Sequence, residues 1–246
     1  MSLLFLWKRL NSLQRRAAGG HGCHRRGTSR SLRGQVVLRL EALEERTVPS
    51  TLTVTNNLDT GIVGDGSLRG EITAAASGDT INFDPSLAGQ TITLTGGELV
   101  IDKSLDIEGP GAGLLTVSGN QTSRVFDVSN HASRVFDISA GATVTIAGVW
   151  ITAGLANGSS PVLASTGGGI LNFGSLTLSG DVLSNNQAVG NASSGKAGVG
   201  GGVANLARAT LAISGSAFTG NQAIGADHSN GFGAGNAQGG AIFNTK

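Results

Sequence analysis

The chain has 246 residues and a formal net charge of +1, which conceals two oppositely charged parts. Residues 1–50 contain ten Lys or Arg and three Glu, a net of +7, whereas residues 51–246 contain seven basic and thirteen acidic residues, a net of −6. Because phosphate binding needs clustered cations, no nucleic-acid binding is expected of the acidic part. The only cysteine, Cys23, lies in the basic part, so residues 51–246 can form neither a disulfide nor a cysteine metal site.

Residues 1–50 have the features of a basic, disordered leader. The apolar run at residues 1–7 is much shorter than the ~20 residues that cross a membrane, so we expect no transmembrane segment. Charge follows this run instead of preceding it, the reverse of an ordinary secretion signal. Residues 8–35 are rich in Arg, Gly and Ser, a composition typical of disordered chain.

The end of this leader carries a short motif. Residues 38–50 resemble the N-terminal sorting motif of planctomycete cell-surface proteins, Leu-Glu-x-Leu-Glu-x-Arg-x-Val-Pro-Ser. The matching residues are Leu40, Glu41, Leu43, Glu44, Arg46, Val48, Pro49 and Ser50. The resemblance implies export, processing near Ser50 and a location at the cell surface or outside the cell. The alternative is a short amphipathic helix before a domain boundary.

Residues 51–246 are expected to form one domain, which begins with a strand at residues 51–55 and a short helix. Ser67 is a plausible N-cap, and Glu71 lies where the helix dipole favours a negative charge. Leu68 and Ile72 share one helical face with Ala75 or Ala76. Such a helix would cover the open apolar end of a stack of repeats.

This start resembles the bacterial extracellular repeat proteins marked by the sequence Cys-Ser-Leu-Arg-Glu-Ala. Ser67, Leu68, Arg69, Glu71 and Ile72 follow that pattern, with Gly70 inserted, and Gly66 stands where the family has its cysteine. Residues 79–83 match the strand that usually comes next.

Short alternating strands continue through residues 90–94, 98–101, 104–107 and 114–117. The sequence Ser-Arg-Val-Phe-Asp at residue 123 recurs at residue 133. This separation is too short for a full repeat, so the second copy either extends a loop or forms a neighbouring strand.

The second half of the chain is repetitive. Gly-Gly motifs that end in Asn begin at Gly167, Gly200 and Gly239, 33 and 39 residues apart. Residues 176–190 match residues 211–225, and residues 144–154 are an earlier relative. A period of this length, with loops at 191–199 and 226–238, predicts one turn of a parallel β-helix per repeat.

In this arrangement like residues stack on like. We expect one hydrogen-bonded ladder of Asn172, Asn205 and Asn244, and another of Asn186 and Asn221. Their role is therefore predicted to be structural rather than catalytic.

The motifs at Gly239-Gly-Ala-Ile and Phe218-Thr-Gly-Asn resemble the repeats of chlamydial polymorphic outer-membrane proteins. The resemblance covers roughly residues 165–246. It implies a right-handed, pectin-lyase-like β-helix at a cell surface, in a family with adhesive members. No capping element follows the third Gly-Gly motif, and we expect the chain to be the front of a longer protein.

No catalytic, cofactor or metal site is predicted. Residues 140–246 contain only two acids, Asp181 and Asp227, the second beside His228 in a predicted loop. Asp102 and Asp106, near Glu108, would share a strand face if that strand is unbroken. Ordinary solvated charge explains this acidic cluster as well.

Trp150 is the one candidate binding residue. Its neighbour Ile151 aligns with apolar residues of later repeats, so Trp150 should point outward, where it could stack on a sugar. The alternative is that the loop at residues 155–166 covers it.

We expect an exported structural or adhesin-like protein without catalytic activity of its own. Its partners would be extracellular polysaccharide or another surface protein. The alternatives are the N-terminal part of a polysaccharide lyase or glycoside hydrolase, or a noncatalytic glycan-binding module.

Overall fold

The computed structural model describes residues 48–121, 126–128, 141–157, 165–190, 197–206, 208–226 and 236–245. Several predicted features lie outside these residues: Cys23, nearly all of the leader, Asp227 with His228, and the second Ser-Arg-Val-Phe-Asp copy.

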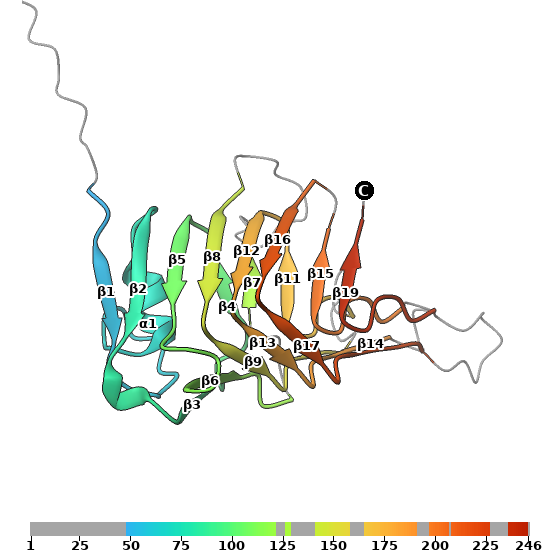
Figure 1. Cartoon of the computed structure of the whole chain (residues 1–246), viewed down its shortest axis with the longest axis horizontal. Helices are drawn as coiled ribbons and strands as arrows, with labels where there is room; N and C mark the ends of the chain where they lie inside the picture. Colours follow the sequence, from blue (N-terminus) through green and yellow to red (C-terminus); the bar gives the residue numbers. More distant parts are fainter. Residues whose placement is uncertain are drawn as a thin grey trace, which may run out of the picture. The chain divides into compact units, whose positions relative to one another are not determined.

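The described residues form an all-β structure with parallel sheets, one α-helix and one short 3-10 helix, η1 (Pro85–Leu87). The strands belong to four sheets, which we number first to fourth (Figure 1). The first sheet contains β1 (Thr51–Val54), β2 (Asp79–Phe83), β5 (Leu105–Glu108), β8 (Thr143–Ala147), β12 (Ser175–Ser179) and β16 (Thr210–Ser214). The second contains β3 (Gln90–Thr93), β6 (Leu115–Ser118), β9 (Trp150–Thr152), β13 (Val182–Ser184) and β17 (Ala217–Thr219). The third contains β4 (Leu99–Ile101), β7 (Phe126–Val128), β11 (Ile170–Asn172), β15 (Val203–Asn205) and β19 (Ile242–Asn244). The fourth contains β10 (Leu155–Ala156), β14 (Gln187–Val189) and β18 (Gln222–Ile224).

Pairing within the sheets follows the sequence repeats. In the first sheet, Leu178 of β12 pairs with Ile146 of β8 on one side and Ile213 of β16 on the other. Leu183 of β13 likewise pairs with Ile151 and Phe218 in the second sheet. Every strand therefore hydrogen-bonds to its counterpart in the neighbouring repeat, and its inward side chains continue a row of like residues.

These inward rows form the core. Side chains alternate in and out along each strand, so every second residue faces inward. Inward residues such as Ile81, Ile107 and Ile146 are fully buried. Burial is incomplete at β16, the last strand of the first sheet. Its Ile213 is 39% exposed, whereas the register partner of Ile213, Leu178, is 0% exposed. Ile224 of β18 is exposed to the same extent.

The Gly-Gly motifs make the tight turns that lead into the third sheet. Gly200 has a φ of +66°, and a Cβ there would lie 2.5 Å from the Val203 carbonyl oxygen. A Cβ on the next residue, Gly201, would collide with the Gln222 backbone. Only glycine fits these positions, which explains why the motif recurs.

The predicted helix is α1 (Leu68–Ala74), with Ser67 as its N-cap accepting a hydrogen bond from the Gly70 N–H. Leu68 and Ile72 are buried in the core cluster that also contains Val54 of β1. Of the two alanines considered for this face, Ala75 is buried and Ala76 is exposed. No helix among the described residues is both long enough and apolar enough to cross a membrane.

Candidate functional site

Trp150 lies on the outer side of the second sheet, as the alternation with Ile151 predicts. Ile151 is fully buried, whereas Trp150 is 38% exposed. The Trp150 Nε1–H donates a hydrogen bond to the Ser184 Oγ at 2.7 Å. Ser184 is two residues beyond Val182, the register partner of Trp150 on β13, so the indole leans over the neighbouring strand instead of standing away from the sheet.

Hydroxyl groups support this orientation. The Ser184 Oγ is 3.2 Å from the Thr152 Oγ1, which in turn donates to the Ser184 carbonyl oxygen at 2.8 Å. Ser184 is only 5% exposed although its side chain is on the outer side, consistent with the indole lying against it. The ring is thus held at a fixed place on the sheet surface.

The asparagine ladders are confirmed. The Asn172 side-chain amide donates to the Asn205 Oδ1 at 2.5 Å, and the Asn205 amide donates to the Asn244 Oδ1 at 2.7 Å. The second ladder is closed by a bond of 2.9 Å from the Asn186 amide to the Asn221 Oδ1. These side chains satisfy one another, so they are not available for chemistry.

The acidic cluster does not form the single face that an unbroken strand would give. Asp102 lies between β4, which ends at Ile101, and β5, which begins at Leu105, so it is on neither strand. Its carboxylate is half exposed and 3.8 Å from the Lys103 Nζ. Asp106 and Glu108 are both exposed on the outer side of β5.

Asp181 is buried, and its carboxylate accepts hydrogen bonds from the Val149 N–H (2.9 Å) and the Ser179 N–H (3.0 Å). Burial raises the pKa of Asp181 to about 6, and these backbone bonds only partly offset the rise. Because the carboxylate joins two successive repeats at a turn, its role is structural.

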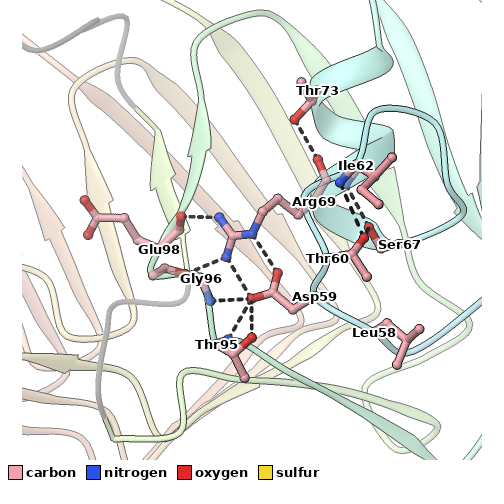
Figure 2. A network of polar contacts seen from close by, with 12 residues as sticks. Leu58, Asp59, Thr60, Ile62, Ser67, Arg69, Thr73, Thr95, Gly96 and Glu98 are labelled. Atoms are coloured by element: carbon pink, nitrogen blue, oxygen red, sulfur yellow. Dashed lines mark hydrogen bonds and ion pairs between the residues drawn. The ribbon is translucent and has the colours of Figure 1, made fainter.

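A polar network that the sequence did not predict surrounds α1 (Figure 2). The Arg69 guanidinium binds both oxygens of Asp59, at 2.6 Å from Nε and 3.1 Å from NH2. Two of its other N–H groups donate to the carbonyl oxygens of Glu98 (2.8 Å) and Gly97 (2.6 Å). The Asp59 carboxylate also accepts from the Thr95 and Gly96 N–H groups.

This network fixes the helix and the preceding loop to the segment before β4. Burial alone would raise the pKa of Asp59, but the bond from Arg69 and those from the Gly96 and Thr95 N–H groups outweigh it, so the pKa is lowered. An arginine that makes four hydrogen bonds through all three of its nitrogens is a structural tie rather than a ligand-binding residue. The signal in the sequence was Arg69 itself, which belongs to the Ser-Leu-Arg motif.

Two further contacts hold the C-terminal end of the helix. The Lys103 Nζ donates to the Ala75 and Ile72 carbonyl oxygens at the helix C-terminus, at 3.1 and 3.2 Å. Gly66, which stands where the resembled family has cysteine, has a φ of +83° and no room for a Cβ beside Thr55. A cysteine in this position would not fit this loop.

A hollow of about 480 Å³ lies at the exposed side of the last repeat. It is lined by Asn205, Arg208, Ala209, Leu211, Ile213, Ile242, Asn244 and Thr245. These include the half-exposed apolar side chains of β16 and β19, so the hollow marks the edge of the stacked strands. Within the described ranges, no three His, Cys, Asp or Glu side chains gather where they could hold a metal ion.

Comparisons of the chain with protein-family models, curated proteins and solved structures found no match.

Proposed function

We propose that the chain is an exported surface protein whose sheets close into a right-handed parallel β-helix of the pectin-lyase-like kind. It acts as a structural, adhesin-like scaffold without catalytic activity of its own. Under this proposal residues 1–50 are the leader and residues 51–246 the helix, and the protein works at the cell surface or outside the cell.

The observation that carries the proposal is the register between repeats. Counterpart strands pair in parallel in all four sheets, as Val144–Leu176–Leu211 illustrates in the first. Successive strands along the chain enter different sheets, for example β12, β13 and β14. This alternation is what a β-helix requires, and it leaves only outward side chains and loops to meet a partner.

The helix α1 supports the capping role expected of it. Leu68, Ile72 and Ala75 join the core cluster beside Val54 of β1, the first strand of the first sheet. An apolar helix face at this edge shields side chains that would otherwise be wet or would pair with another chain.

Export is supported by the leader sequence, and the composition of residues 51–246 does not oppose it. The motif from Leu40 to Ser50 resembles a planctomycete surface-sorting signal, and it directly precedes β1. The absence of cysteine from residues 51–246 means that this part needs no particular redox environment to fold.

Cell fractionation tests the proposal. An antibody raised against residues 51–246 is used to blot surface and cytosolic fractions of cells that produce the protein. We expect the signal in the surface or extracellular fraction, with the leader removed near Ser50. A cytosolic product that retains residues 1–50 would contradict export and with it the surface function.

A further inference from the structure

The outer side of the second sheet is a regular surface built from two rows of side chains, which we call the Trp150 face. The first row is Thr91, Thr116, Trp150, Val182 and Ala217. The second row is Thr93, Ser118, Thr152, Ser184 and Thr219. Every member of the second row has a hydroxyl group, and neighbouring strands place these groups about 4.8 Å apart.

Trp150 is the one large side chain on this face. The residues beside it in the first row, Thr116 and Val182, are smaller and only partly exposed. The bond from Nε1 to Ser184 turns the ring edge toward the sheet. Trp150 is 38% exposed, so part of the indole is accessible to solvent, and residues 158–164 of the loop considered as its cover lie outside the described residues.

The chemistry of the Trp150 face indicates the class of ligand. None of the ten residues of the Trp150 face is charged, so the face offers no ion pair to an anionic or cationic partner. An indole presents a partly negative ring face, which suits the weakly positive C–H groups on the flat side of a pyranose. The hydroxyl groups of Ser184 and Thr152 are already bonded to Trp150 and to each other, but the other hydroxyl groups of the second row can both donate to and accept from sugar hydroxyls.

The first sheet provides a contrast within the same molecule. Its outer side also has hydroxyl side chains, such as Thr145 and Thr177, but no aromatic one on its described strands, because Phe83 of β2 packs against the core. It carries the exposed carboxylates of Asp106 and Glu108. Hydroxyl groups therefore do not distinguish the two sheets. A tryptophan on an uncharged face occurs on the second sheet and not on the described strands of the first.

We propose that the Trp150 face binds an uncharged polysaccharide, with one pyranose stacked on the indole and adjacent sugars hydrogen-bonded to the second row. The second row crosses five strands, a length on the order of 19 Å, which accommodates a short run of linked sugars. The inference rests on the proposed function, since a surface-exposed scaffold is where such a ligand would be met.

Tryptophan fluorescence tests the proposal directly because the chain has only two tryptophans, Trp7 and Trp150. In a Trp7→Phe background the emission reports on Trp150 alone. The full chain is titrated with three soluble neutral probes: a mixed-linkage β-glucan, a xyloglucan and a galactomannan. We expect at least one to shift the emission saturably, whereas polygalacturonate, an anionic probe, does not.

Variants measured by affinity electrophoresis in gels with the same polysaccharides complete the test. Trp150→Ala should weaken binding at least about tenfold, and Trp150→Phe, which keeps a ring but loses the bond to Ser184, should lose less. Thr116→Lys places a long charged side chain beside the indole without touching the core, and it should also weaken binding. Thr177→Ala, on the first sheet, is the matched control and should bind like the wild type.

The outcomes separate this proposal from the previous one. If none of the neutral polysaccharides binds, or if Trp150→Ala and Thr116→Lys bind as well as the wild type, the proposed surface is wrong. A protein that is found at the cell surface yet binds none of these probes would overturn the Trp150 face and leave the proposed location in place. Thermal unfolding of each variant checks that lost binding does not reflect lost structure.

Discussion

At the scale of single residues, stability depends on side chains that connect one repeat with the next. Asn205 is at the centre of its ladder: it accepts from Asn172 and donates to Asn244 and to the Ala209 carbonyl oxygen. It is only 2% exposed, so water cannot replace these partners. Removal of a buried, hydrogen-bonded amide lowers the stability of a protein more than removal of a surface polar group does.

We therefore expect Asn205→Ala to lower the free energy of unfolding by about 3 kcal/mol, because buried polar groups on both sides lose their partner. Gln222→Ala, at an exposed position of β18, is the control and should change it by less than about 0.5 kcal/mol. Chemical denaturation of both variants measures the difference. Equal effects would mean that the ladder does not contribute to stability.

Asp181 makes a prediction about pH. Its folded-state pKa of about 6 is above the value of an unfolded aspartate, so the folded state binds more protons between these values. Stability from this group is consequently present at pH 4 and lost as the pH rises through 6, by up to about 3 kcal/mol.

Denaturation at pH 4 and pH 7 tests this by comparing the wild type with Asp181→Asn, which cannot titrate. The variant should gain relative to the wild type as the pH rises, although at either pH it loses one of the two bonds from the Val149 and Ser179 N–H groups. Asp106→Asn, an exposed substitution on β5, controls for general charge effects. A difference between wild type and Asp181→Asn that stays constant with pH would refute the assignment.

At the scale of elements, α1 depends on the geometry of one guanidinium. Arg69 uses Nε, NH1 and NH2 together to bind Asp59 and the Glu98 and Gly97 carbonyl oxygens. Asp59 is nearly inaccessible, with its side chain 2% exposed. A lysine keeps the charge but has neither the planar fork nor the reach to make all these bonds.

Arg69→Lys should therefore destabilise the protein by about 3 kcal/mol and increase amide hydrogen exchange in α1. Arg208→Lys, an exposed and conservative change, should have almost no effect. Thermal unfolding and exchange measured by mass spectrometry provide the two readouts. Full stability in Arg69→Lys would show that charge alone, and not the fork of hydrogen bonds, holds the helix.

A second prediction at this scale concerns the last strands of the first, second and fourth sheets. β16, β17 and β18 each pair with one strand only, and Ile213 and Ile224 on them are half exposed. Amides of residues 210–224 should therefore exchange at least about tenfold faster than those of residues 175–189, their counterparts one repeat earlier. Equal protection would mean that something else covers this edge.

Elements with a clear periodicity could be predicted from the sequence, and elements without one could not. Strands such as β8 and β12 alternate over five residues and recur in the next repeat, so both their class and their stacking could be inferred. The strands of the fourth sheet have two or three residues, too few to show alternation, and they were not predicted. Asp59 and Arg69 lie outside any repeat, and nothing in the local sequence indicates that they meet.

The same reasoning applies to the candidate site. The outward direction of Trp150 followed from its neighbour Ile151, because a strand places successive side chains on opposite sides. Its bond to Ser184 did not, since that contact is diagonal across two strands and depends on the rotamer of the indole. The break between β4 and β5 that separates Asp102 from Asp106, by contrast, lies between the strands predicted at residues 98–101 and 104–107, where charged residues interrupt the pattern.

At the scale of the whole molecule, the register between repeats determines the core, the asparagine ladders and the Trp150 face. In the first sheet Thr145 faces Thr177, and in the second Val182 faces Ala217. Cα atoms of directly paired residues on neighbouring strands are about 4.8 Å apart, within the range that a disulfide spans. Diagonal positions two residues further are about 7–8 Å apart, outside that range.

The most direct test introduces cysteine pairs at these positions in a Cys23→Ser background, where no other thiol is present. Peptide mapping after mild oxidation then measures which pairs are bonded. Thr145→Cys with Thr177→Cys, and Val182→Cys with Ala217→Cys, should both form disulfides within one chain, whereas Thr145→Cys with Ser179→Cys should not. Disulfides in the diagonal pair, or in neither of the two register pairs, would contradict the stacked parallel arrangement and everything inferred from it.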